Sequence, residues 1–231
     1  MRGDVDVAAV AELVADSTRA TMLAALTDGR ALTAGELARR ARVAPSTASG
    51  HLARLTAGGA LAVERQGRHH YYRIADAGVI QILQSLAALA PVAPPRTLRE
   101  SDTLADVRRA RTCYTHLAGA LGVALADALV AGGILSEVAD GYAVTEAGAD
   151  CLAAFGLDLA ADSRRRIQFA PHHIDWSERR HHVAGALGAA LFRRMLGLGW
   201  LRRVRGSRAV RLTEAGKDGL REWFGMDAAG W

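Results

Sequence analysis

The chain has 231 residues, half of them apolar, which suffices for one large domain or two small ones with a buried core. No apolar stretch is long enough to span a membrane, and the first residues lack the basic start and long apolar run of a signal peptide. The only two cysteines, Cys113 and Cys151, imply no disulfide framework. We therefore expect a cytoplasmic protein with reduced thiols that does not contact a membrane.

The net charge of +5 is concentrated in one segment. Residues 37–73 contain seven arginines and one acidic residue, so this segment carries +6 and the remainder of the chain −1. A local basic patch on a near-neutral body indicates a polyanionic partner such as nucleic acid. The alternative is a solvated arginine-rich face, which charge alone does not exclude.

The first third of the chain predicts a helix-turn-helix motif followed by a β-hairpin. Apolar residues at helical spacing predict helices over residues 7–26. Thr33 and Glu36 have the spacing of a capping box that opens the next helix, and Pro45 suits the first position of the helix after it. Two glycines then end that helix, and residues 61–74 predict two short strands around a turn at Gly67.

The helix that begins near Pro45 has small and hydroxyl-bearing residues in its first two turns. Such residues are mediocre helix formers, but they allow close approach to a DNA major groove and hydrogen bonds to base edges and phosphates. The following hairpin carries basic side chains that could contact the DNA backbone or minor groove. The predicted DNA-contacting residues are Ser46, Thr47, Ser49, His51 and Arg54 on the helix and Arg65, Arg68, His69 and His70 on the wing.

Together these elements resemble the winged-helix domain of the ArsR/SmtB family of bacterial transcriptional repressors. The resemblance covers about residues 5–90 and rests on Ser49-x-His51-Leu52, the Gly-x-Leu helix exit, the Arg-x-Gly-Arg wing tip and Tyr71-Tyr72. It implies repression by a homodimer that forms through the first and last helices of the domain and binds double-stranded DNA with an inverted-repeat operator. The last helix would present the apolar residues Val79, Ile82, Leu83, Leu86 and Leu89, although this stripe could instead pack against the C-terminal half.

The two metal sites of that family have no counterpart in this sequence. Where one family site has paired cysteines, Ala38, Arg39 and Arg40 follow Glu36-Leu37. On the last helix of the domain Asp76 stands alone, and Gly78 occupies the position of a histidine ligand. Because thiolate and imidazole ligands are missing, we expect no transition metal at these two places.

The C-terminal part contains an internal duplication. We predict a Pro-rich linker and connecting helix over residues 91–110, followed by a duplicated domain over 111–231 with repeats at about 113–158 and 179–227. HLAGALG begins at His116 and HVAGALG at His182, and three further blocks follow in the same order in both copies. The N-terminal domain fits the same frame more weakly, for example through Leu37-Ala38 against Leu117-Ala118.

Each copy is about six residues shorter than the N-terminal domain at the place of its DNA-reading turn. We therefore predict winged-helix-like units without DNA-reading parts, which either sense a ligand or stabilise a dimer. Each apolar face would lie on one long helix, or on two helices separated at Val123, and the copies would pack about a pseudo-twofold axis. The apolar positions are Leu117, Leu121, Leu125 and Leu129 in the first copy and Val183, Leu187, Leu191 and Met195 in the second.

Several residues of the C-terminal half are candidates for chemistry. Cys113 and His116 would lie on one helix face, where they could bind a metal or lower a thiol pKa, and His172 and His173 are further candidate ligands. Against a metal, His116 and His182 hold equivalent repeat positions, which indicates a structural role, and Arg179 takes the place of Cys113 in the second copy. We predict no cofactor, with a bound transition metal as the alternative.

Asp175 and Glu178 have the spacing of a capping box, which predicts a helix start with Trp176 at its mouth. A structural N-terminus is the simpler interpretation of this segment. The alternative is a pocket for a small-molecule effector, lined by Trp176, His116 and His182.

The sequence as a whole predicts a mainly α protein with small β-hairpin wings. A winged helix-turn-helix domain would occupy residues 1–90, and two winged-helix-like repeats would form an α-rich C-terminal domain. The predicted function is sequence-specific DNA binding in transcription regulation, by a homodimeric repressor that is not an enzyme. Two alternatives are a metal- or thiol-dependent sensor or enzyme centred on Cys113 and the C-terminal histidines, and an interaction module whose winged helix no longer binds DNA.

Overall fold

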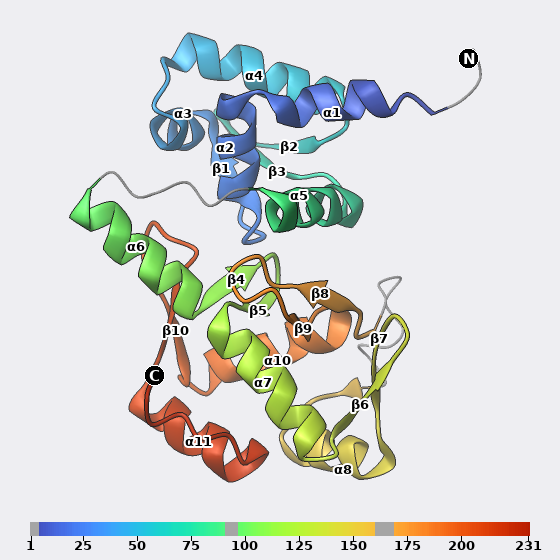
Figure 1. Ribbon diagram of the computed structural model, residues 1–231. Coiled ribbons are helices and arrows are strands. Elements are labelled where there is room, and N and C mark those ends of the chain that lie inside the picture. Colours follow the sequence, from blue (N-terminus) through green and yellow to red (C-terminus); the bar gives the residue numbers. More distant parts are fainter. Residues whose placement is uncertain (1–4, 91–96, 160–168) are drawn as a thin grey trace. The chain divides into compact units, whose positions relative to one another are not determined.

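The computed structural model describes residues 5–90, 97–159 and 169–231 and divides into two compact units, with the boundary between Gln84 and Ser85 (Figure 1). The boundary falls inside a helix, α5 (Ala77–Leu89). The connecting helix predicted after the linker is α6 (Leu98–Arg109), which belongs to the second unit. The Pro-rich linker itself, at 91–96, lies outside the described residues.

The first unit is a winged helix-turn-helix, as the sequence predicts. Four helices and three strands precede α5: α1 (Val7–Ala15), α2 (Ser17–Leu26), β1 (Leu32–Thr33), α3 (Ala34–Ala41), α4 (Pro45–Ala57), β2 (Leu61–Gln66) and β3 (His69–Ile74). The strands form one antiparallel sheet in the order β1-β3-β2. The Thr33–Glu36 capping box is present, and Pro45 is at the start of α4.

The core of the first unit forms between α2, α3, α4 and the base of the hairpin. Its fully or almost fully buried side chains are Met22, Leu23, Leu26, Leu37, Leu52, Leu55, Leu61 and Ile74. Leu52 and Leu55 therefore anchor one side of α4 in the core and leave its other side free. Arg42, which has a left-handed backbone at φ 55°, ends α3 and turns the chain toward α4.

The second unit repeats one series of elements, hairpin–helix–hairpin–helix. After α6, the first series consists of β4 (Arg111–Cys113), β5 (His116–Ala118), α7 (Ala120–Ala131), β6 (Leu135–Val138), β7 (Gly141–Val144) and α8 (Glu146–Ala154). The second consists of β8 (His172–Ile174), β9 (His181–Val183), α10 (Gly185–Gly197), β10 (Leu201–Arg203), β11 (Val210–Leu212) and α11 (Glu214–Phe224). The helices therefore alternate with two-stranded antiparallel sheets.

The repeated segment, Leu-Ala-Gly-Ala-Leu-Gly in the first copy and Val-Ala-Gly-Ala-Leu-Gly in the second, does not form one long helix, so that expectation is wrong. Leu117 and Val183 lie on strands, and the helices begin after Gly119 and Ala184. Gly119 has φ 81°, a left-handed conformation that favours glycine, and a Cβ there would lie 2.6 Å from the Arg108 carbonyl oxygen. The alternative of two helices separated at Val123 is also wrong, because α7 runs through Val123 without a break.

The two series pack on each other reciprocally. Helix α7 packs on β9, and α10 packs on β5. Leu117 and Leu125 of the first series meet Val183 and Leu191 of the second in one apolar core. Glycines at equivalent positions, Gly122 and Gly188, let each helix approach the strand before it, and an added Cβ would meet the carbonyl of Leu117 or Val183.

Helices α4, α7 and α10 end in the same way. Each is followed by a glycine with a left-handed backbone, Gly59, Gly133 or Gly199, at φ 73°, 67° and 71°. The next amide donates to a carbonyl five residues back at 2.9 Å in all three, and a strand begins one residue later. The predicted correspondence between Leu37-Ala38 and Leu117-Ala118, which precede these helices, is wrong, however. Leu37-Ala38 lie on helix α3, whereas Leu117-Ala118 lie on strand β5.

Candidate nucleic-acid interface and histidine cluster

The first turns of α4 present a small, polar face to solvent. Ser46, Thr47, Ser49 and Arg54 are exposed, whereas Ala48 is buried with the two leucines that anchor the helix. A Cβ added at Gly50 would meet nothing within 4 Å, so this face is open. The Ser49 hydroxyl donates to the Pro45 carbonyl at 2.9 Å, and its oxygen can still accept a hydrogen bond.

His51 differs from the other predicted contacts on α4, because it is half-buried. Its Nδ1 lies 3.5 Å from a carboxylate oxygen of Asp16. Asp16 caps α2 through the Arg19 amide, and this hydrogen bond lowers the pKa of the Asp16 carboxyl. His51 on α4 therefore lies against the start of α2, a proximity that the local sequence pattern does not predict.

The wing places its basic side chains around a tight turn. Arg65 pairs with His70 across the hairpin, Gln66 pairs with His69, and Gly67 supplies the left-handed residue of the turn at φ 57°. The four predicted wing contacts, Arg65, Arg68, His69 and His70, are all exposed. Arg65, His70 and Ser49 also line one groove between α4 and the wing.

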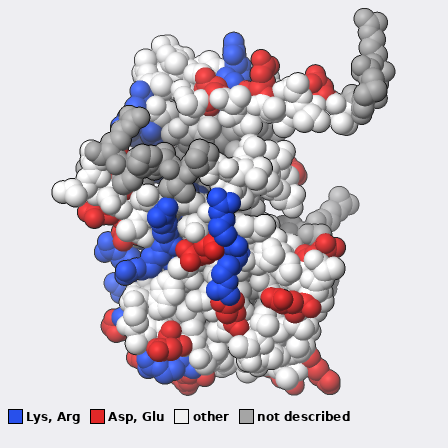
Figure 2. Space-filling view, viewed as in Figure 1, with Lys and Arg blue, Asp and Glu red and all other residues white. Residues whose placement is uncertain are grey.

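The arginines of the basic segment are largely accessible. Six of the seven are exposed, and Arg40 is half-buried. On the face of the second unit shown in Figure 2, basic and acidic side chains lie among each other instead of forming a patch of one sign. Since the residues outside 37–73 sum to −1, the concentration of positive charge lies in the helix-turn-helix and wing.

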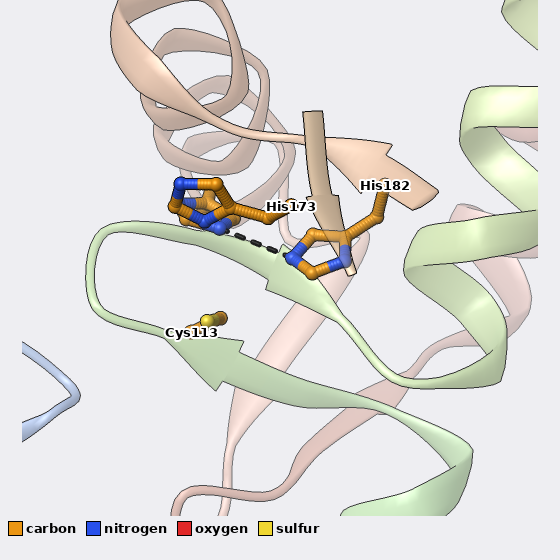
Figure 3. A group of neighbouring side chains, drawn as sticks. Cys113, His173 and His182 are labelled. Atoms are coloured by element: carbon orange, nitrogen blue, oxygen red, sulfur yellow. Dashed lines mark hydrogen bonds between the residues drawn. The ribbon is translucent and has the colours of Figure 1, made fainter. Parts of the chain in front are cut away.

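A second candidate site lies where the hairpins β4–β5 and β8–β9 meet (Figure 3). Cys113 pairs with His116 across the first hairpin, and His173 pairs with His182 across the second. One ligand atom from each of these four side chains lies within 4.8 Å of the others, and the Nε2 atoms of His116 and His182 are 3.2 Å apart. His116 and His182 are buried, and Cys113 and His173 are half-buried.

The sequence predicts only part of this cluster. Cys113 and His116 do lie together, but across a hairpin and not on a helix face. His172 points elsewhere and stacks on His181 at 4.3 Å between ring centres. The counterpart of Cys113 in the second copy is His173 and not Arg179, because six residues instead of two connect the second pair of strands.

The histidines of the cluster are held in the neutral form. Burial lowers the pKa of His116 well below its usual value, that of His173 to about 4 and that of His182 to about 3. The Nδ1 atoms of His173 and His182 are buried and accept or donate no hydrogen bond. Neutral imidazoles of this kind present free lone pairs at neutral pH.

Asp175 does not begin a helix, so the predicted helix start is wrong, although its carboxylate does accept from the Glu178 amide at 3.2 Å as the capping box predicts. One carboxylate oxygen accepts from the backbone and hydroxyl of Ser177 in a turn, and the other accepts from Arg111 and the Gly119 amide, both at 2.6 Å. Burial opposes ionisation of this carboxyl, but Arg111 and these hydrogen bonds outweigh it and hold the pKa well below its usual range. Trp176 packs on the Arg111 guanidinium, 4.8 Å from the ring centre.

Comparisons with known proteins identify the type of protein. A family model described as a helix-turn-helix domain matches residues 14–64. A curated relative from Bacillus subtilis (strain 168), named the uncharacterized HTH-type transcriptional regulator YdfF, is 42% identical over 212 residues, which span 92% of this chain and 94% of that protein. This chain belongs to the HTH-type transcriptional regulators.

Solved structures similar to this regulator include two bacterial proteins. One is the homodimeric winged helix-turn-helix DNA-binding domain of Mb0332 from Mycobacterium bovis, a possible ArsR-family regulator. It is 27% identical, the match covers 38% of this chain and 89% of that chain, and the TM-score is 0.34. The other is the transcriptional repressor BigR from Xylella fastidiosa, at 21% identity, 38% and 88% coverage and TM-score 0.35. Among the described parts of the regulator, no helix has the length and apolarity needed to cross a membrane.

Proposed function

We propose that this regulator is a homodimeric repressor of the ArsR type that binds an inverted-repeat operator in double-stranded DNA. The observation that carries the proposal is the open face of α4, where hydroxyls stand beside a glycine with no bulky side chain among them. Such a face fits into a major groove and offers donors and acceptors to base edges. It directly precedes the basic wing in the chain.

Within this interface the side chains have different roles. Ser46, Thr47 and Ser49 contact base edges and adjacent phosphates, and His51 holds the start of α2 against α4 beside them. Arg54 on α4 and Arg65, Arg68, His69 and His70 on the wing contact the phosphate backbone or the minor groove.

Dimerisation is supported by apolar side chains that the single chain leaves exposed. On α1, Val7 is 69% and Val10 44% exposed, and α1 buries none of its residues. On α5, Ile82, Leu86 and Leu89 are 40%, 45% and 82% exposed. Exposed apolar side chains along a helix are typical of a protein interface, and we assign those of α1 and those of α5 to contacts with a second copy of this chain.

We further propose that the second unit is a duplication of a winged-helix-like module that has lost DNA reading. The repeated element order and the shared helix exits of α4, α7 and α10 support a common origin. Unlike the first turns of α4, those of α7 and α10 are mostly buried in the core. Their role is therefore within the protein, in stabilising the dimer or in responding to an effector.

The test is the affinity of the purified protein for duplex DNA from upstream of its own gene, compared with scrambled duplex at two salt concentrations. We expect preference for the upstream duplex and a steep loss of affinity with salt. Thr47→Ala combined with Ser49→Ala should reduce the preference by about 10- to 100-fold. Thr21→Ala is the matched control, because Thr21 is also exposed and its hydroxyl also donates to a carbonyl four residues earlier.

Two results would overturn the proposal. Equal affinity for upstream and scrambled duplex at both salt concentrations would favour an interaction module with a winged helix that does not read sequence. An unchanged preference in the double variant would mean that α4 is not the reading helix.

A further inference from the structure

The cluster of Cys113, His116, His173 and His182 contains the ligand types of a transition-metal site. One thiol and three imidazoles are ligands that zinc and similar divalent metals prefer, whereas calcium and magnesium require carboxylate or carbonyl oxygens. The carboxylate next to the cluster, Asp175, is already bonded by Arg111 and Gly119. The donor set therefore favours a borderline metal such as Zn²⁺.

The distances within the cluster suit a tetrahedral ion. With zinc–nitrogen bonds of about 2.0–2.1 Å, two nitrogens at the tetrahedral angle lie about 3.3 Å apart. The Nε2 atoms of His116 and His182, which form a hydrogen bond in the absence of an ion, are 3.2 Å apart and so already lie close to this value. The four ligand atoms all lie within 4.8 Å of one another. Side-chain rotations that shift these atoms by about 1 Å would therefore complete the tetrahedron.

The surroundings of the cluster also resemble those of a metal site. A metal-bound histidine commonly directs its second ring nitrogen at a carboxylate, which fixes the ring orientation. With the His182 Nε2 in the cluster, its Nδ1 lies 3.9 Å from a carboxylate oxygen of Asp175. The side chain of Asp175 is itself fixed by the buried Arg111 and by the turn at Ser177.

The cluster without an ion leaves polar groups uncompensated. The Nδ1 atom of His173 is buried without a partner, whereas the Nε2 atoms of His116 and His182 form a hydrogen bond with each other. The Nδ1 atom of His182 also lacks a hydrogen bond, but it lies on the Asp175 side of the ring and would not bind the ion. Buried nitrogens without a hydrogen bond are costly. The half-buried Cys113 and His173 provide access from solvent.

We propose that Cys113, His116, His173 and His182 bind one tetrahedral divalent transition metal of the Zn²⁺ class. Each of the two hairpins supplies two ligands, so the ion joins the two copies of the duplicated unit. Four protein ligands leave no open position, which makes the site structural and not catalytic. This inference does not depend on DNA binding, and the site lies elsewhere in the chain than the two ArsR/SmtB metal positions, where ligands are missing.

The experiment is a Co²⁺ titration of the full-length protein after removal of metal with a chelator. We expect one Co²⁺ per chain, with the strong visible d–d absorption of tetrahedral cobalt, a near-ultraviolet thiolate-to-cobalt band, and displacement by Zn²⁺. Cys113→Ser should remove the thiolate band. His173→Ala should weaken Co²⁺ binding by more than about 100-fold. A residue that only hydrogen-bonds to a ligand would cause a smaller loss of affinity, so this result would identify His173 as a ligand itself.

The chain offers matched controls for both ligand types. His172→Ala removes an imidazole next to the site, and Cys151→Ser removes a thiol elsewhere in the same unit. Both variants should leave the Co²⁺ titration unchanged. If the ligand variants fail to fold, X-ray absorption of the zinc-loaded wild type should show about three nitrogen and one sulfur neighbours. Absence of stoichiometric Co²⁺ binding, an equal effect of His172→Ala and His173→Ala, or an oxygen-dominated coordination shell would overturn the proposal.

Discussion

The Arg111 guanidinium and the Asp175 carboxylate form a buried ion pair, 2.6 Å long, between residues 64 positions apart. Arg111 opens the first hairpin of the duplicated unit, and Asp175 lies in the turn within the second. The same carboxylate oxygen accepts from the Gly119 amide, directly before α7. The pair therefore ties both hairpins and the start of a helix to one point.

Arg111→Met should lower the free energy of unfolding by about 3–5 kcal/mol, because it leaves a buried carboxylate without its counter-charge. Adding Asp175→Asn should recover part of this loss, since the remaining group is neutral. Urea denaturation followed by circular dichroism measures both variants. Asp127→Ala is the control, because Asp127 pairs with Arg180 at the surface at 2.7 Å and should cost less than about 1 kcal/mol.

Arg68→Ala on the wing should weaken binding to specific and scrambled DNA by a similar factor. If Arg68 contacts one phosphate, the slope of log affinity against log salt should decrease by about 1. Fluorescence anisotropy at four or five salt concentrations measures the slope. Arg205→Ala is the control, since Arg205 is an exposed arginine between the strands of a hairpin in the second unit. A slope that changes equally in both variants would contradict the assignment of the wing.

Leu86→Glu on α5 should dissociate the proposed dimer, because it would place a carboxylate in an apolar interface without a partner. We expect a dimer dissociation constant raised by about 100-fold or more, which corresponds to about 2.7 kcal/mol. Analytical ultracentrifugation across a concentration series measures this constant. Val138→Glu, at a similarly exposed valine on β6, should leave it unchanged. A wild-type protein that is monomeric at all concentrations would exclude the dimer.

Gly188→Ala in α10 should destabilise the second unit. The added methyl would meet the Val183 carbonyl and lie 3.0 Å from the His116 Cβ, and such overpacking costs about 1–3 kcal/mol. Thermal melting should show the loss as a lower midpoint. Gly197→Ala in the same helix meets nothing within 4 Å, so it should be neutral or raise stability by up to about 1 kcal/mol. Equal midpoints for the two variants would argue against the tight approach at Gly188.

The sequence predicts the first unit well because its signals are local. A capping box at Thr33, a proline at the start of α4 and a glycine turn in the wing each specify the backbone within a few residues. The hairpins before α7 and α10 are missed because their leucines and alanines have helical spacing. Packing of each hairpin against the helix of the other copy decides their conformation, and no local pattern reports it.

The histidine cluster is predicted only in part for a related reason. The residues Cys113 and His116 are close in sequence, and the duplication identifies His182 as the counterpart of His116. His173 is hidden by the longer connection in the second hairpin, which shifts it by several positions relative to Cys113. Nothing in the sequence indicates that Arg111 is buried, because an arginine in a charged stretch is normally expected at the surface.

The buried first turns of α7 and α10 bear on the length of DNA that one molecule protects. Among the described residues, α4, α7 and α10 share the same exit into a hairpin, and of these three helices α4 alone presents its beginning to solvent. The footprint on DNA is therefore set by the number of chains and not by the number of modules. A dimer should protect two half-sites about one turn of the double helix apart, and the second unit should add mass without extending the protected region.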